Sequence, residues 1–124
     1  MPSDWCEIFV DGVEDVRALV PLVSTAAHGR IDDTSVTSAE GIDIYVGTNS
    51  TNPRFARVPP KTDFNVWPFV IDLGVDEERG IPLVTAMLRK LWNRDLRAGA
   101  VCSFEEKLPR SGGYRDGQLI LTDD

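Results

Sequence analysis

A strand followed directly by a helix is predicted twice in this chain, and this repetition constrains the fold more than any other feature of the sequence. The first unit covers Trp5 to Ala27, and the second covers Trp67 to Asp95. With 124 residues, 42% of them hydrophobic, the chain has the size of one domain with one core. The pattern therefore predicts a single α+β domain over residues 1–124, in which two helices pack on a sheet.

Local signals place the elements of the first unit. The apolar stretch from Cys6 to Val10 predicts the first strand, which ends at the turn pair Asp11-Gly12. Apolar residues three and four positions apart then predict a helix over residues 13–27. Because Pro21 removes one hydrogen bond inside that helix, we expect a kink, or a break into two short helices, between residues 19 and 22.

The middle of the chain predicts two strands and one long loop. We expect one strand over residues 31–38 and another over residues 42–46, where apolar and polar residues alternate. Residues 47–66 are rich in turn-forming residues and predict an extended loop, within which residues 55–58 are a candidate edge strand. Loops of this length are uncommon in compact domains and often carry function.

The second unit and the C-terminal segment complete the order of elements. We expect a strand over residues 67–75, a helix after residues 76–79 with Pro82 in its first turn, and a last core strand over residues 100–106. Asp116-Gly117 predicts a C-terminal hairpin or an extra edge strand. The order β-α-β-β-α-β is that of a ferredoxin-like, or split β-α-β, antiparallel sheet with two helices on one face. That fold serves many functions, so it does not identify one.

Composition excludes several classes of function. Twenty acidic residues against 13 lysines and arginines give a net charge of −7, which disfavours binding to nucleic acid or to an anionic membrane surface. The N-terminus has no features of a secretory signal and no apolar run is long enough to span a bilayer, so we expect a cytoplasmic protein. The single histidine, His28, belongs to no zinc or catalytic motif, and no nucleotide-binding motif occurs. We therefore expect no catalytic residues, no metal and no cofactor.

The two cysteines, Cys6 and Cys102, are too few for a disulfide scaffold. In a ferredoxin-like sheet the first and last strands are antiparallel neighbours, and strand alternation places both thiols on the helix side, close to each other. We expect both to be reduced, buried and unreactive, with pKa values raised by burial.

The same alternation defines a second face of the sheet, which no helix covers. Aromatic and acidic side chains from four strands are predicted there: Trp5, Glu7, Phe9, Asp43, Tyr45, Asp72 and Glu105. Aromatic side chains are typical anchors of protein interfaces, and carboxylates steer a basic partner toward a surface. The face therefore predicts a protein-binding surface, which we call the open face.

Three other interpretations of the open face remain. Its polar residues meet solvent while its aromatic residues pair across strands; or residues 118–121 fold across it; or it is a homodimer interface. The third is disfavoured because a two-fold axis would bring like charges together.

The long loop is a second candidate site. Arg54, Arg57 and Lys61 form a basic island that is suited to a carboxylate or phosphate group. The alternative interpretation is a solvated basic loop. If the island binds a ligand, the protein is a small anionic-ligand-binding sensor, or an enzyme whose site lies between this loop and the sheet.

The C-terminal half also resembles known proteins. Trp67 to Leu73, followed by a helix, and then Ala100 to Pro109 resemble segments of small acidic bacterial proteins, some of which are immunity proteins of toxin systems. The shared motifs are apolar strand motifs, so no functional residue is carried over. The resemblance implies a cytosolic protein that occludes a partner. Together with the acidic charge, it favours a non-enzymatic inhibitor or immunity-type protein that neutralises a basic protein partner such as a toxin.

Overall fold

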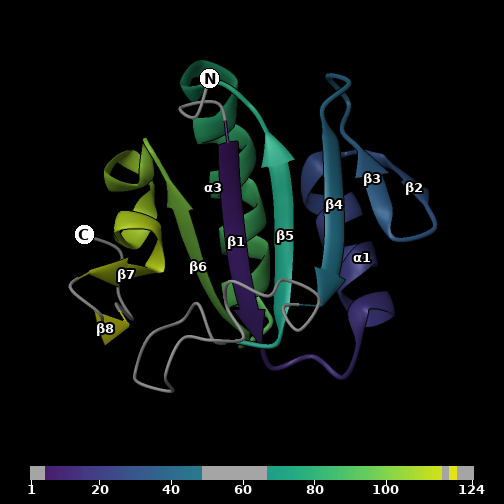
Figure 1. The fold of residues 1–124 in the computed structure, drawn as a ribbon, viewed down its shortest axis with the longest axis horizontal. Helices are drawn as coiled ribbons and strands as arrows, with labels where there is room; N and C mark the ends of the chain where they lie inside the picture. The colour runs from purple at the N-terminus through teal and green to yellow at the C-terminus, as the bar shows by residue number, and fades with distance from the viewer. Residues whose placement is uncertain (1–4, 49–66, 116–117, 120–124) are drawn as a thin grey trace.

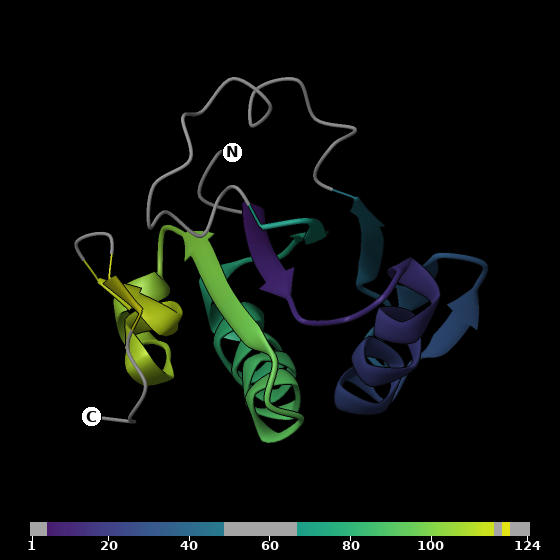
Figure 2. The same ribbon diagram turned by 90° about the horizontal axis from the view of Figure 1, so that it is seen from below.

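The computed structural model of the chain describes residues 5–48, 67–115 and 118–119. Its elements, in chain order, are β1 (Trp5–Asp11), α1 (Val16–Ala27), β2 (Arg30–Asp32), β3 (Ser35–Thr37), β4 (Asp43–Thr48), β5 (Phe69–Gly74), α3 (Glu77–Asn93), β6 (Arg97–Cys102), the 3₁₀ helices η4 (Glu105–Lys107) and η5 (Pro109–Gly113), β7 (Tyr114–Arg115) and β8 (Gln118–Leu119). Six strands form one antiparallel sheet in the order β2-β3-β4-β5-β1-β6 (Figure 1). Both α1 and α3 lie on one side of this sheet (Figure 2). The predicted α+β domain with an antiparallel sheet and two helices is confirmed.

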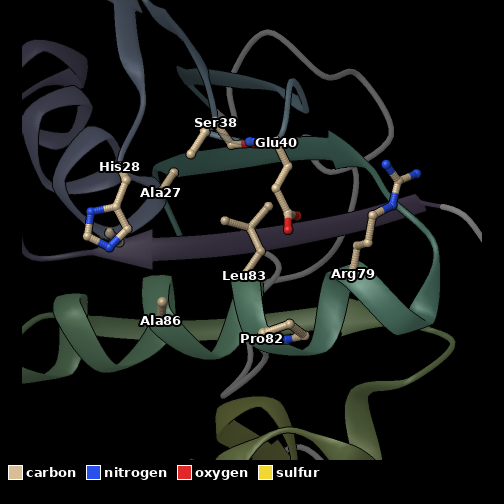
Figure 3. A pocket seen from close by; sticks show the side chains of 10 residues that line it. Ala27, His28, Ser38, Glu40, Arg79, Pro82, Leu83 and Ala86 are labelled. Carbon is tan, nitrogen blue, oxygen red and sulfur yellow. The ribbon is translucent and has the colours of Figure 1, made fainter.

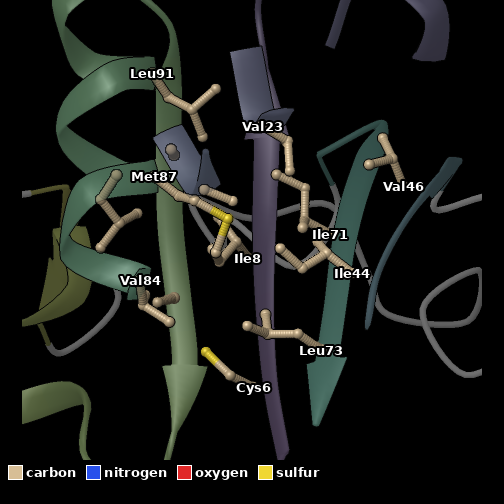
Figure 4. Close-up of a cluster of buried hydrophobic side chains, with 14 of the residues drawn as sticks. Cys6, Ile8, Val23, Ile44, Val46, Ile71, Leu73, Val84, Met87 and Leu91 are labelled. Carbon is tan, nitrogen blue, oxygen red and sulfur yellow. The ribbon is translucent and has the colours of Figure 1, made fainter. Parts of the chain in front are cut away.

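The core lies between the sheet and the two helices. Val46, Ile71, Ile8 and Ala100 form one row across β4, β5, β1 and β6, and all four are buried. Met87 of α3 belongs to the same buried cluster as these residues (Figure 4). The two helices therefore cover the side of the sheet that strand alternation predicted.

Helix α1 is continuous, so the expected break near Pro21 is wrong. The helix begins at Val16 because the Asp15 carboxylate caps it by accepting the backbone N–H of Ala18 at 3.0 Å. Pro21 faces solvent, where its ring disturbs no packing, and its carbonyl accepts the Thr25 hydroxyl at 2.9 Å. The lost hydrogen bond is offset because the other face of the helix buries four large apolar side chains: Leu19, Val20, Leu22 and Val23.

Pro82 lies in the interior of α3 and not in its first turn, contrary to the prediction. The helix begins five residues earlier, at Glu77, because the Asp76 carboxylate accepts the backbone N–H of Arg79 at 3.3 Å and caps the helix there. Pro82, like Pro21, is exposed. An exposed proline can thus sit inside a helix whose opposite face is buried.

The strand predicted over residues 31–38 is two short strands, β2 and β3, joined by a tight turn. Asp33 has a φ of 59° in this turn, a left-handed conformation that aspartate tolerates better than most residues. The candidate edge strand at residues 55–58 lies outside the described residues. The predicted C-terminal hairpin is confirmed, since Tyr114 pairs with Leu119 in a separate two-stranded sheet.

Strand β6 is shifted toward the N-terminus relative to its prediction, ending at Cys102 and not at Glu106. The chain leaves the sheet because Phe104 turns into the core, where it is 1% exposed. Its ring packs on the first turn of α3, against Gly80, where a Cβ atom would lie only 2.6 Å from the Phe104 Cζ. The backbone then continues as η4.

Candidate functional site

The open face presents one continuous row of side chains across four strands. Tyr45 of β4 is the cross-strand partner of Asp72 of β5, Asp72 is the partner of Glu7 of β1, and Glu7 is the partner of Val101 of β6. Three of the residues predicted from the sequence thus lie side by side at the centre of the sheet.

Exposed apolar side chains gather on this face. Four large apolar residues are exposed in the described part of the chain, and three of them point to the open face: Tyr45 at 54%, Trp5 at 47% and Val101 at 40%. The fourth, Ile31, lies on the other side of the sheet at its β2 edge, opposite the buried Val36. Val101 was missed from the sequence, although it lies in the strand predicted over residues 100–106, where alternation places it on the same face as Glu105.

Two carboxylates face each other at the centre of the open face. Glu7 and Asp72 are directly opposed and half-buried. Asp43 lies on the same face two residues before Tyr45, is exposed, and accepts a hydrogen bond from the Thr37 hydroxyl at 3.3 Å. Together these three carboxylates make the open face acidic.

Phe9 is not available as an anchor, contrary to the prediction. It lies on the open face by register, but it is only 1% exposed. Its cross-strand neighbours are Val70 on one side and Gly99 on the other. A glycine opposite an aromatic residue leaves room for the ring to lie against the sheet. Phe9 is therefore a buried packing residue of this face.

Glu105 does not belong to the open face either. The predicted strand placed it there, but β6 ends before it, and Glu105 begins η4. Its carboxylate turns back and accepts the backbone N–H of Cys102 at 3.1 Å. Glu105 therefore caps the end of β6, and the open face has three of the four carboxylates that were predicted.

The second predicted site cannot be placed, because Arg54, Arg57 and Lys61 lie outside the described residues. The same holds for residues 120–121 of the segment that was considered as a cover for the open face. Its described part, β8, pairs with β7 and lies beyond the β6 edge of the sheet (Figure 1).

A shallow groove lies on the helix side, between the end of α1, the turn before β4 and the first turns of α3 (Figure 3). It has a volume of about 260 Å³, with His28, Glu40 and Arg79 among the residues around it. These three side chains are exposed, and the Arg79 guanidinium is paired with Asp76 at 3.1 Å. This volume is below the roughly 300–1,000 Å³ of typical ligand pockets, so the open face is the stronger candidate.

His28 has a structural role at the rim of this groove. It is the left-handed C-cap of α1, with a φ of 51°, and its backbone N–H bonds the Thr25 carbonyl at 3.4 Å. The hydroxyl of Ser24, one turn earlier, donates to the Gly29 carbonyl at 2.8 Å. Since that hydroxyl is engaged by the backbone, Ser24 and His28 do not form a nucleophile and base pair in this structure.

Two other features are absent from residues 5–48, 67–115 and 118–119. No group of three or more histidine, cysteine, aspartate and glutamate side chains in these ranges is arranged to hold a metal ion. Nor does any helix in them have the length and apolar character needed to cross a membrane.

Comparison with known proteins gives no match: neither a family model, nor a curated protein, nor a solved structure matches this chain.

Proposed function

We propose that this protein is a non-enzymatic binding protein of the inhibitor or immunity type, whose open face engages a basic protein partner such as a toxin. The observation that carries the proposal is the row Tyr45, Asp72, Glu7 and Val101, in which two opposed carboxylates lie between exposed apolar side chains. Such a surface matches a partner that presents lysine or arginine between apolar residues.

The two kinds of side chain have separate roles in this proposal. Tyr45 and Trp5 are large and exposed, and burying them against a partner supplies most of the affinity. Glu7, Asp72 and Asp43 supply orientation and attraction, because a cluster of carboxylates on a chain of net charge −7 raises the rate of encounter with a cationic surface.

We further infer that the fold is ferredoxin-like, with the β2-β3 hairpin as an addition beside β4. The strand order β6-β1-β5-β4 supports this inference, because it corresponds to fourth, first, third and second strands of a split β-α-β domain. With α1 and α3 on one side, such a domain leaves the other side of its sheet for recognition.

The first experiment is co-purification of the tagged protein with the products of adjacent genes at low salt. A recovered partner is then titrated against Tyr45→Ala, Glu7→Gln and the control Ile31→Ala. Ile31 is a matched control because it is as exposed as Tyr45 but lies on the other side of the sheet. We expect a loss of affinity of ten-fold or more for Tyr45→Ala, a smaller loss for Glu7→Gln that shrinks at high salt, and no change for Ile31→Ala.

Equal losses for Tyr45→Ala and Ile31→Ala would contradict the proposal.

The mass of the protein in solution tests the competing homodimer. Light scattering at micromolar concentration is expected to give a monomer, because a two-fold interface on this face would bring Glu7 and Asp72 of two subunits together. A dimer that Tyr45→Ala dissociates would assign the open face to self-association and overturn the proposal.

A further inference from the structure

Cys6 and Cys102 are directly opposed across the pair of strands β1 and β6. Both point to the helix side, as the alternation predicted. Directly opposed residues in an antiparallel pair have Cα atoms about 4.5–5.5 Å apart. That separation falls within the roughly 4.4–6.8 Å over which a disulfide forms without backbone movement. The two thiols are free in this structure, and the strands already hold them where a bond can form.

The two thiols differ in access, which corrects the expectation that both are core residues. Cys6 lies on an interior strand and is fully buried, whereas Cys102 is the last residue of the edge strand β6 and is only half-buried. Within the described residues no other strand pairs with the outer side of β6, and the chain turns away at Ser103, the residue after Cys102. Of the pair, Cys102 is therefore the thiol that a reagent in solution reaches.

The two thiols also differ in acidity, again contrary to the expectation for Cys102. The hydrogen bond that Cys6 shares with Cys102 raises the pKa of Cys6 far above its ordinary value, and burial adds to this effect. The same hydrogen bond, helped by the backbone N–H of Phe104, lowers the pKa of Cys102. Burial and the Glu105 carboxylate oppose this lowering at Cys102, whereas the Glu7 and Glu105 carboxylates raise the pKa of Cys6 further. Cys102 is thus the preferred thiolate, and Cys6 keeps its proton.

We propose that Cys6 and Cys102 form a reversible disulfide by exchange with low-molecular-weight disulfides such as oxidised glutathione, with Cys102 as the attacking thiol and Cys6 as the resolving thiol. The Cys102 thiolate bonds to one glutathione sulfur and releases the other glutathione as a thiolate. The Cys6 sulfur then bonds to the Cys102 sulfur as the bond between Cys102 and the second glutathione breaks, and this departing glutathione takes up the Cys6 proton. Two protein thiols are oxidised, and one glutathione disulfide is reduced to two thiols.

The test uses the native wild-type protein with excess oxidised glutathione near neutral pH, followed by intact-mass measurement and peptide mapping. We expect a loss of two hydrogens, a peptide that links Cys6 to Cys102, and full reversal by a dithiol reductant. Because the bond closes a loop over most of the chain, we also expect the oxidised protein to melt roughly 10 °C or more above the reduced protein.

Two single variants test the separate roles. Cys6→Ala is expected to keep one glutathione on Cys102, because no resolving thiol is present, and Cys102→Ala is expected to remain unmodified while folded. The wild-type measurement needs no substitution, so the proposal stays testable if a variant fails to fold. The proposal would be overturned if the wild-type protein retains glutathione on Cys102 without forming the disulfide. It would also be overturned if the wild-type protein does not react although Cys6→Ala does. Equal modification of both single variants would refute the assignment of roles.

Discussion

Gly29, which links α1 to β2, lies so close to β3 that it leaves no room for a side chain. A Cβ atom at this position would lie 2.3 Å from the Thr37 carbonyl oxygen and 2.8 Å from the Val36 Cγ1. The first contact is with backbone, which cannot turn aside as a flexible side chain can. Gly29→Ala therefore has to move β3 away from the end of α1 by about an ångström to restore normal contact distances.

Hydrogen bonds make that movement costly. The Gly29 N–H bonds the Ser24 carbonyl at 3.0 Å, the Ser24 hydroxyl bonds the Gly29 carbonyl at 2.8 Å, and the Ala39 N–H bonds the Ala27 carbonyl at 3.2 Å. Overpacking costs about 1–3 kcal/mol, and the loss of one of these bonds costs about 1 kcal/mol more. We expect the free energy of unfolding to fall by about 2–4 kcal/mol, which lowers Tm by roughly 8–15 °C in a chain of this length.

Thermal unfolding followed by circular dichroism measures this change. Gly47→Ala is the matched control, because a Cβ atom there would meet nothing within 4 Å. We expect the control to stay within about 0.5 kcal/mol of the wild type. A Gly29→Ala variant that melts within about 2 °C of the wild type would refute the close approach of the β2-β3 hairpin to α1.

Two further predictions concern the helices. Pro21→Ala should stabilise the protein by about 1–3 kcal/mol, because alanine restores an N–H that can bond the Arg17 carbonyl and the exposed ring contributes no packing; a thermal melt no higher than that of the wild type would contradict this. Asp76→Asn should keep the cap of α3 but lose the charge. The hydrogen bond to the Arg79 side chain lowers the pKa of Asp76 in the folded protein. The wild type should therefore be more stable than this variant above the ordinary aspartate pKa of about 3.9. This difference in stability should disappear as pH falls through the lower pKa of the folded state. Urea unfolding at pH 7 and pH 3 checks this, and an equal difference at both pH values would contradict it.

The sidedness of the sheet could be predicted because it depends only on strand alternation. Once Cys6 to Val10 is a strand, the side chains of Ile8 and Glu7 must point to opposite faces, whatever packs around them. The row that joins Tyr45, Asp72 and Glu7 required one more fact, the cross-strand register, which the sequence does not specify by itself.

Features that depend on tertiary packing could not be predicted. Phe104 alternates correctly for a strand, yet it leaves the sheet because Gly80 of α3 offers a space that only contact between distant segments creates. Phe9 is buried on a face that its local sequence marks as exposed. Pro21 is a strong helix breaker by local propensity, but burial of the opposite face of α1 outweighs that propensity.

The thiol pair and the open face meet at neighbouring positions of the same two strands. Cys6 opposes Cys102, and the next pair along β1 and β6 is Glu7 and Val101, whose side chains point to the open face. A disulfide on the helix side would therefore fix the spacing of the strands directly beneath one end of the proposed binding row. Fixing a surface before binding reduces the entropy lost on association. We therefore expect a partner to dissociate more slowly from the oxidised protein than from the reduced protein. Protein that lacks either thiol should still bind a partner through the open face.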